Sequence, residues 1–285
     1  MKIGLDLTEK EISAALTDNT SIVRTIDMPI FFQKRDSNKI IMEKILSLIH
    51  EILNDEVDGI GISLPSTCDK KGRIVYDIQK IPYWKKIKIK DLLEKEFNVP
   101  VAVNNDINCF LLGEKHYGTN LYSNNILGIC ADKKIDAGLI LNNKLLTSNQ
   151  ACFNNIKCLS EAHHEYIRLY KDSYSRTLEE LQLLCCNSDF KETKTSDHRV
   201  WSEIGSCVGR LISVLIVNYD IHSVVMGGKL ADCLCKYIGH IDDYLLSLFP
   251  KKKLLGLLIT RSKFKNPRPL GAVHCLKDIP VNIGA

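Results

Sequence analysis

Short alternating apolar segments open the chain and predict strands. Three of them are separated by polar residues typical of turns, and they predict antiparallel strands at residues 3–7, 12–16 and 22–26. From Ser37-Asn38 to Leu53, isoleucine and leucine recur at helical spacing and predict an amphipathic helix. A buried strand is expected within Val57–Pro65, and a second helix near Lys88–Phe97. Strands with helices between them indicate an α/β arrangement.

The second half of the chain repeats this plan. Apolar alternation predicts further strands at 125–131, 137–141, from the Asn142-Asn143 turn to Thr147, at 222–226 and at 254–260. Helical spacing predicts helices at 157–171, 176–186, from an Asp197 cap to Tyr219, at about 230–249, and from Leu270 onward. The repeat predicts a duplicated α/β fold with domains 1–118 and 119–268 and a cleft between them. The closing helix, within 269–285, is expected to pack back on the first domain.

The stretch Val99–Gly118 contains the strongest candidate chemistry. An alternating strand turns through Asn104, Asn105 and Asp106 into a helix that ends at Gly118. Asp106 falls where an N-cap is expected. There the helix amides and dipole favour the charged carboxylate, which could accept a proton from a substrate hydroxyl. A helix cap and a general base are both compatible with Asp106.

Composition and charge narrow the class of protein. Hydrophobic residues make up 45% and charged residues 25% of 285 residues, which is ordinary for a soluble globular protein. The net charge of +4, 38 minus 34, is too small to indicate nucleic-acid binding. No apolar run long enough to span a bilayer and no signal peptide are expected. Eleven cysteines without an export signal predict reduced thiols and a cytoplasmic location.

The predicted elements, taken in order, resemble the ROK family of sugar kinases and repressors. That family has the actin-like, hexokinase-like ATPase fold, built from ribonuclease H-like domains. The resemblance covers nearly the whole chain, and its motifs are Ile3–Asp6 with Ile12–Leu16, Asp58–Pro65, Gly72–Val75, Ile81–Trp84, Pro100–Asn108 and His222–Gly228. A winged-helix DNA-binding module, present in several ROK repressors, is not expected, because the chain begins at the first kinase strand.

The resemblance implies roles for particular residues. Asp106 would be the general base that deprotonates a sugar hydroxyl, and Asn105 would hydrogen-bond the sugar. Asp6 would orient the metal ion or the γ-phosphate of ATP. Gly227 and Gly228 would lie against the nucleotide, and Gly138, which keeps the family register, is assigned to the same cofactor site. A helix-entry turn is the alternative explanation of the glycine pair.

Both phosphate loops depart from the family pattern. Active relatives follow Asp6 with Gly-Gly-Thr-Lys, whereas this chain has Thr8-Glu-Lys-Glu11, which places Glu9 and Glu11 where phosphates should lie. Lys10 offsets part of this negative charge. The second loop, Gly-Thr-Gly-Ile-Gly in the family, is Asp132-Lys-Lys-Ile-Asp136 here and predicts an ordinary charged hairpin tip. Binding of ATP and Mg²⁺ is therefore expected to be weak or lost.

The sugar and zinc element of the family is also missing. Active members carry Glu-x-Gly-His followed by Cys-x-Cys-Gly-x-x-Gly-Cys. Here Cys152 keeps the first cysteine, Phe153 replaces the second, and no histidine precedes them in the short segment Thr147–Lys157. Two ligands cannot complete a closed four-ligand zinc site. No zinc or other bound metal site is expected.

These departures favour a degenerate ROK protein. The main hypothesis is a carbohydrate-related binding or regulatory protein with weak or no kinase activity, cytoplasmic and homodimeric, without membrane or direct DNA contact. The alternative is an active ATP-dependent hexose or N-acetylhexosamine kinase, a glucokinase-like phosphotransferase to an alcohol group, with Asp106 as its base. A DNA-bound repressor is the least favoured, since no helix-turn-helix segment or basic face is expected.

Overall fold

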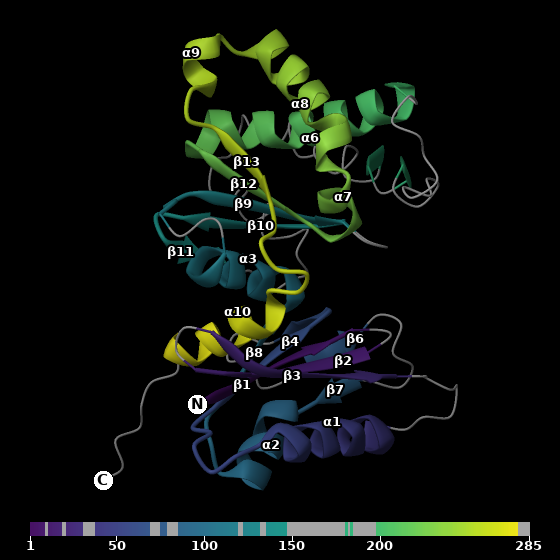
Figure 1. Ribbon diagram of the computed structural model, residues 1–285, viewed down its shortest axis with the longest axis vertical. Coiled ribbons are helices and arrows are strands. Elements are labelled where there is room, and N and C mark those ends of the chain that lie inside the picture. The colour runs from purple at the N-terminus through teal and green to yellow at the C-terminus, as the bar shows by residue number, and fades with distance from the viewer. Residues whose placement is uncertain are drawn as a thin grey trace. The chain divides into compact units, whose positions relative to one another are not determined.

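The computed structural model forms two compact units (Figure 1). Unit 1 comprises Met1–Leu121, Asn149–Ala151 and Asn266–Ala285, and unit 2 comprises Tyr122–Ser148 and Cys152–Lys265. The residues that the structure describes are 1–8, 11–18, 21–30, 38–68, 75–78, 85–118, 122–131, 135–146, 180–181, 183–184 and 198–278. Each unit contains a five-stranded sheet covered by helices, so the predicted α/β class is confirmed.

The sheet of unit 1 has the strand order β3-β2-β1-β4-β8. Its strands are β1 (Lys2–Leu7), β2 (Glu11–Thr17), β3 (Ile22–Pro29), β4 (Ile60–Leu64) and β8 (Val101–Asn105). The first three are antiparallel, as predicted, while β1, β4 and β8 run parallel. A smaller antiparallel sheet joins β5 (Ser66–Cys68), β6 (Val75–Ile78) and β7 (Lys85–Ile87).

The two faces of this sheet differ in side-chain size. In β1, Ile3, Leu5 and Leu7 face the apolar core formed with α1 (Asn38–Ile52) and α2 (Ile89–Phe97). The alternate residues Gly4 and Asp6 point to the other face, because successive side chains in a strand alternate. Helix α10 (Arg268–His274) packs on that second face, also against α3 (Asp106–Tyr117) (Figure 1). A short 3₁₀ helix, η1 (Cys275–Asp278), follows α10.

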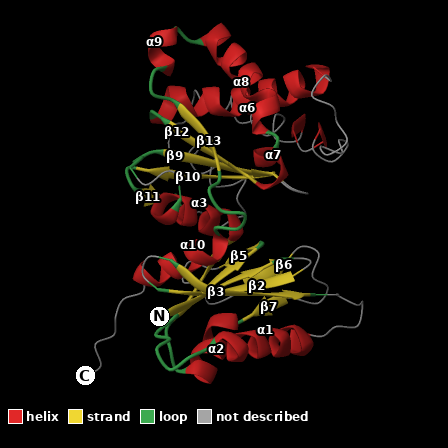
Figure 2. Cartoon of the chain, in the orientation of Figure 1, coloured by secondary structure: helices red, strands yellow, loops and turns green. Residues whose placement is uncertain are grey.

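Unit 2 repeats the arrangement with its own core. Its sheet has the order β11-β10-β9-β12-β13, with β9 (Ile126–Ala131), β10 (Ile135–Leu141), β11 (Lys144–Leu145), β12 (Ser223–Gly227) and β13 (Leu258–Arg261). Its helices are α6 (His198–Tyr219), α7 (Gly228–Asp232), α8 (Leu234–Leu248) and α9 (Lys251–Leu254). Figure 2 shows α6 and α8 in red above the yellow strands. Apolar residues of α6, α8 and the sheet form one buried cluster that includes Trp201 and Tyr237.

Several element boundaries differ from the predictions. The helix expected at 230–249 is two helices, because Cys233 adopts φ −105° and ψ 7° between α7 and α8. Apolar spacing continues across this break, so periodicity does not reveal it. The strand expected at 254–260 is shorter, since α9 and a positive φ of 87° at Gly256 precede β13. The helices predicted at 157–171 and the Asp197 cap lie outside the described residues, as does most of 176–186.

Helix α6 contains an apolar stretch that the sequence analysis did not anticipate. Within the described ranges, His198–Val217 alone is long and apolar enough to cross a membrane by length and composition, so the expectation of no such run is wrong. About 61% of this window is buried inside the protein, where it forms part of the core of unit 2. Packing in a protein core accounts for its apolar character.

Candidate functional site

A row of polar side chains lies at the carboxyl ends of the parallel strands in unit 1. Asp6 of β1 pairs in register with Ser63 of β4, which pairs with Asn104 of β8. Residues directly opposite each other in adjacent strands present their side chains on the same face of a sheet. In open α/β sheets, ligands bind in the crevice outside these strand ends. The row is therefore a candidate ligand-binding site.

Asp6 is enclosed by hydrogen-bond donors of its own unit. Its side chain is buried, and its Oδ1 atom accepts a hydrogen bond of 2.7 Å from the Ser63 hydroxyl. The other oxygen, Oδ2, accepts a bond of 2.9 Å from the Asn266 amide. An Arg268 guanidinium nitrogen, Nη1, lies 3.6 Å from the same Oδ2. A buried carboxylate requires such partners, because an unpaired buried charge is very costly.

The junction of β8 and α3 holds the predicted base. Asn105 is the N-cap of α3, and its Oδ1 accepts a bond of 2.9 Å from the Asn108 amide. The prediction that Asp106 occupies the cap is therefore wrong by one residue. Asp106 is the first helical residue and is partly exposed, and its Oδ1 accepts a bond of 2.9 Å from the Ile107 amide. A carboxylate in the first turn remains stabilised in its charged form by the helix dipole.

Asn104 organises this junction, a role that its place in the predicted turn did not reveal. Its Oδ1 accepts bonds from the Asn105 amide at 2.8 Å and from the Asn108 side chain at 2.9 Å. Its Nδ2 donates to the sulfur of Cys275 at 3.5 Å. The run of asparagines was visible in the sequence, but the partner Cys275 was not. These bonds hold the strand-to-helix turn that positions Asn105 and Asp106.

Two buried thiols lie beside the same strand ends. Cys109 of α3 interacts with Cys275, and burial, together with Cys275 and Asp6, raises the pKa of the Cys109 thiol well above its usual value. The reactive form of cysteine is the thiolate. The environment of Cys109 therefore favours a neutral packing residue, and no spacing signal in the sequence distinguishes it.

The turn that follows Asp6 forms a closed hairpin. Thr8 and Glu11 exchange backbone and side-chain hydrogen bonds: the Thr8 amide and hydroxyl both donate to the Glu11 carbonyl at 2.9 and 3.0 Å, and the Glu11 amide donates to the Thr8 hydroxyl at 3.1 Å. Phosphate-binding loops offer free backbone amides to their ligand. Here both flanking amides are used inside the hairpin. Glu9 and Lys10, which lie between them in the sequence, are outside the described residues.

The glycines assigned to a cofactor lie in unit 2. Gly138 is buried within β10, directly opposite Gly128 of β9. Gly227 ends β12, and Gly228 begins α7 with a φ of 70°, a conformation that favours glycine. The pair therefore makes a strand-to-helix turn. Of the second predicted loop, Asp136 lies in β10 opposite Cys130, and residues 132–134 lie outside the described ranges.

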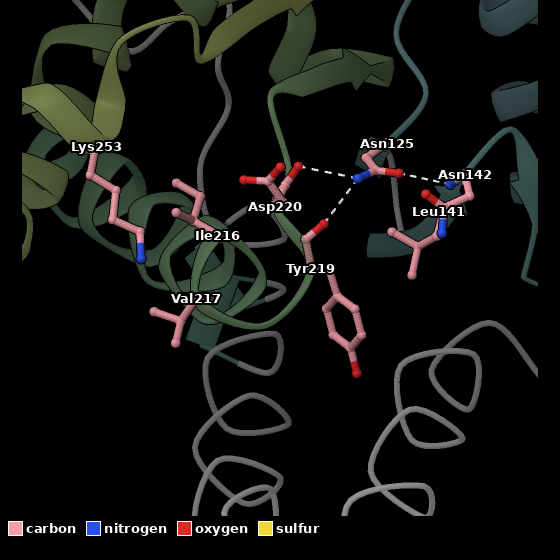
Figure 3. A pocket seen from close by; sticks show the side chains of 8 residues that line it. All are labelled: Asn125, Leu141, Asn142, Ile216, Val217, Tyr219, Asp220 and Lys253. Carbon is pink, nitrogen blue, oxygen red and sulfur yellow. Dashed lines mark hydrogen bonds between the residues drawn. The ribbon is translucent and has the colours of Figure 1, made fainter.

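Unit 2 also carries an open hollow of about 510 Å³ (Figure 3). Its lining residues are Asn125, Leu141, Asn142, Ile216, Val217, Tyr219, Asp220 and Lys253. Asn125 donates to the carbonyls of Tyr219 and Asp220 at 3.1 and 3.3 Å and accepts from the Asn142 amide at 2.7 Å. These bonds tie the end of α6 to the turn after β10. The hollow lies beside the amino end of β9, at the opposite end of that strand from Gly227.

The described part of the chain contains no group of three or more histidine, cysteine, aspartate or glutamate side chains placed to hold a metal ion. Cys152, Phe153 and Cys158, on which the zinc prediction depends, lie outside the described ranges, so that prediction stands untested. At Asp6, the guanidinium of Arg268 places a positive charge where a divalent cation would have to bind. This donor set does not fit a magnesium ligand.

The two units share one sheet plan, in which three antiparallel strands are followed by two strands parallel to the third, and this repeated plan defines a protein of the actin-like ATPase fold. The ROK family profile matches residues 2–153, more than half of the sequence, and the chain belongs to the ROK family. A crystal structure of a ROK family transcriptional regulator, a homologue of the Escherichia coli Mlc protein, superimposes with a TM-score of 0.73. It is 16% identical in sequence, and the match covers 97% of this chain and 78% of the regulator.

Relatives with curated names include both repressors and kinases. The xylose repressor of Bacillus spizizenii is 30% identical over 149 residues, which cover 50% of this chain and 38% of the repressor. The glucokinase of Thermotoga maritima is 28% identical over 148 residues, covering 51% of this chain and 46% of the kinase. The chain thus spans less than half the length of either relative. Both the repressor and the kinase are named after a sugar, xylose and glucose respectively.

Proposed function

We propose that this chain is a carbohydrate-related binding or regulatory protein of the ROK family with weak or no kinase activity. The observation that carries the proposal is the buried Asp6 carboxylate, whose two oxygens are engaged by Ser63, Asn266 and Arg268. Phosphoryl transfer depends on positioning and on neutralising charge around the phosphates. A carboxylate already paired with a guanidinium is poorly suited to orient a metal ion or a γ-phosphate.

The turns that the family resemblance assigns to the cofactor support the same conclusion. The amides of Thr8 and Glu11 are bonded within their hairpin, and the second loop carries Asp132 and Asp136 in place of glycines. Gly138 is enclosed in a strand, while Gly227 and Gly228 retain the turn that would lie against a nucleotide. Among the described residues assigned to the cofactor, the glycine pair therefore offers the best remaining support for residual ATP binding. We place the protein in the cytoplasm as a homodimer, and we assign it no zinc and no direct DNA contact.

A second candidate function is an active ATP-dependent hexose or N-acetylhexosamine kinase. Asp106 favours it, because this carboxylate is partly exposed at the start of α3 with Asn105 immediately before it. In that role Asp106 would accept the proton of a sugar hydroxyl as the oxygen attacks phosphorus. Asn105 would hydrogen-bond the sugar, although its Oδ1 also caps α3.

The deciding experiment is sugar-dependent ADP formation with Mg-ATP across hexoses and N-acetylhexosamines. Asp106→Asn is the control, since it removes the base and keeps the size of the side chain. We expect no turnover above that control, together with sugar binding detected by calorimetry. Turnover that disappears in Asp106→Asn would establish the kinase instead. Absence of both turnover and binding would refute a carbohydrate ligand.

A further inference from the structure

The C-terminal anchor segment, Asn266–Cys275, lies in unusually close backbone contact with the rest of unit 1. A Cβ atom added to Gly4 of β1 would lie 2.1 Å from the Pro269 carbonyl oxygen. One added to Gly61 of β4 would lie 2.2 Å from the Ala272 carbonyl oxygen, and one on Gly113 of α3 would lie 2.2 Å from that of Pro267. Each contact is with backbone, which cannot rotate away. Glycines on two strands and a helix therefore form the surface on which this segment packs.

Polar contacts anchor the same segment at the end of β1. Asn266 donates to Asp6 Oδ2, and Arg268, the first residue of α10, places its guanidinium 3.6 Å from that oxygen. The Arg268 side chain is only 19% exposed and that of Asp6 is 1% exposed. Water screens a pair this enclosed only weakly, so the two charges interact strongly. Asn266 and Asp6 are 260 residues apart in the sequence.

We infer that Arg268 is a built-in cation that occupies the metal-binding position of Asp6, so that a divalent ion and the C-terminal anchor segment compete for one carboxylate. Magnesium requires oxygen ligands at about 2.0–2.1 Å in near-octahedral geometry. An ion bound to Oδ2 at that distance would lie close to the guanidinium, and like charges repel strongly in a buried site. Asp6 thereby serves to hold the segment instead of a metal. The inference deepens the proposed function, on which it rests, by naming the residue that closes the site.

The test is a titration of the full-length chain with Mn²⁺, in which bound ion is measured as loss of the free Mn²⁺ signal in electron paramagnetic resonance. Arg268→Met removes the charge and keeps the length of the side chain. We expect it to bind one Mn²⁺ at least tenfold more tightly than the wild type does, with Mg²⁺ as competitor. Adding Asp6→Asn to Arg268→Met should abolish the gain. Lys277→Met, which removes an exposed charge from η1, is the matched control and should behave as wild type.

Two results would overturn the inference. One is a folded Arg268→Met protein with no gain in Mn²⁺ affinity. The other is a wild-type site that Asp6→Asn removes, since Asp6 would then be open to metal already. Arg268→Lys, which keeps the charge, should bind Mn²⁺ no better than wild type, and an equal gain there would exclude charge as the cause. If Arg268→Met does not fold, the same Mn²⁺ titration of Arg268→Gln, and of wild type against Asp6→Asn, still tests the inference.

Failure of this inference can be separated from failure of the proposed function. A protein without sugar-dependent ADP formation whose Arg268→Met variant gains no Mn²⁺ site would refute only the competition for Asp6. A wild-type protein with both turnover and an Asp6-dependent Mn²⁺ site would refute both.

Discussion

Single side chains at the α3–α10 contact show how burial changes acid–base behaviour. His116 of α3 and His274 of α10 stack with ring centroids 3.5 Å apart and planes 12° from parallel. The Nδ1 atom of His274 is buried and, among the described residues, has no hydrogen-bond partner. Burial, aided by the charges of His116 and Lys277, lowers the pKa of His274 to about 3. The folded state therefore keeps this ring neutral.

This shift predicts a loss of stability in acid. The pKa of histidine in an unfolded chain is about 6.5, so between pH 6.5 and 3 the unfolded chain binds a proton that the folded chain does not. Stability is then fully present above pH 6.5 and falls as pH decreases through that range. His274→Phe keeps an aromatic ring against His116. It should reduce the slope of the unfolding free energy against pH by up to the equivalent of one bound proton. Urea denaturation at several pH values from 7.5 to 4 measures the slope.

The control for this prediction is His198→Phe, which replaces an exposed histidine at the start of α6. It should leave the pH dependence of the unfolding free energy as it is in the wild type. An unchanged slope in His274→Phe would show that the neutral ring of His274 does not set the acid sensitivity.

At the scale of elements, α10 is the piece that completes unit 1. It packs on β1, β4 and α3. The sheet residues on the face toward α10 are small or polar, whereas those on the opposite face are large and apolar. The sequence Ile3-Gly-Leu-Asp6 alternates between these two faces, as does Ile60-Gly-Ile-Ser63. Large side chains fill the core under α1 and α2, and small ones admit the backbone of α10. Packing density leaves no room for an added methyl group there.

Two helical glycines give opposite predictions for the same substitution. Gly113→Ala would place a methyl group against the Pro267 carbonyl, and overpacking of this kind costs about 1–3 kcal/mol. Gly239 lies in α8 with nothing within 4 Å of its added Cβ, so Gly239→Ala should stabilise by about 0.5–1 kcal/mol through helix propensity. Chemical denaturation measures both changes. A Gly113→Ala protein as stable as the wild type would disprove the close packing of the C-terminal anchor segment on α3.

At the scale of the molecule, each unit has a separate hydrophobic core. The core of unit 2 includes Trp201, which is 1% exposed and stacked on Tyr237 with ring centroids 6.4 Å apart. The core of unit 1, as far as the structure describes it, contains no residue of α6 or α8. Chains with more than one core need not unfold in a single step. The two units can therefore respond separately to substitutions.

A single-tryptophan protein would test this separation. Trp84→Phe leaves Trp201 as the only tryptophan of the two in the chain. In that background Leu211→Ala, within the core of unit 2, should lower the stability reported by Trp201 fluorescence by about 2–5 kcal/mol. Gly113→Ala should leave the same transition in place. If both substitutions shift it equally, the units unfold as one cooperative block.

The sequence by itself determined the class of fold, most elements and the family. Alternating apolar residues predicted β1, β2 and β3, and helical spacing predicted α1 and α6, because burial of one face leaves a local period in the sequence. The Asn-Asp junction before α3 was also visible, although Asn105 proved to be the cap. The break at Cys233 was not, since a single turn does not disturb an apolar pattern.

Only the tertiary structure decided what surrounds the candidate residues. Asn266 and Arg268 are partners of Asp6, and Cys275 is a partner of Asn104. The sequence around Asp6 and Asn104 does not predict these distant partners. A local pattern encodes burial and backbone preference, whereas the pairing of distant charges depends on how strands and helices pack. The sequence thus proposed Asp6 as a ligand for a metal or phosphate, and the fold surrounded it with the donors of the C-terminal anchor segment.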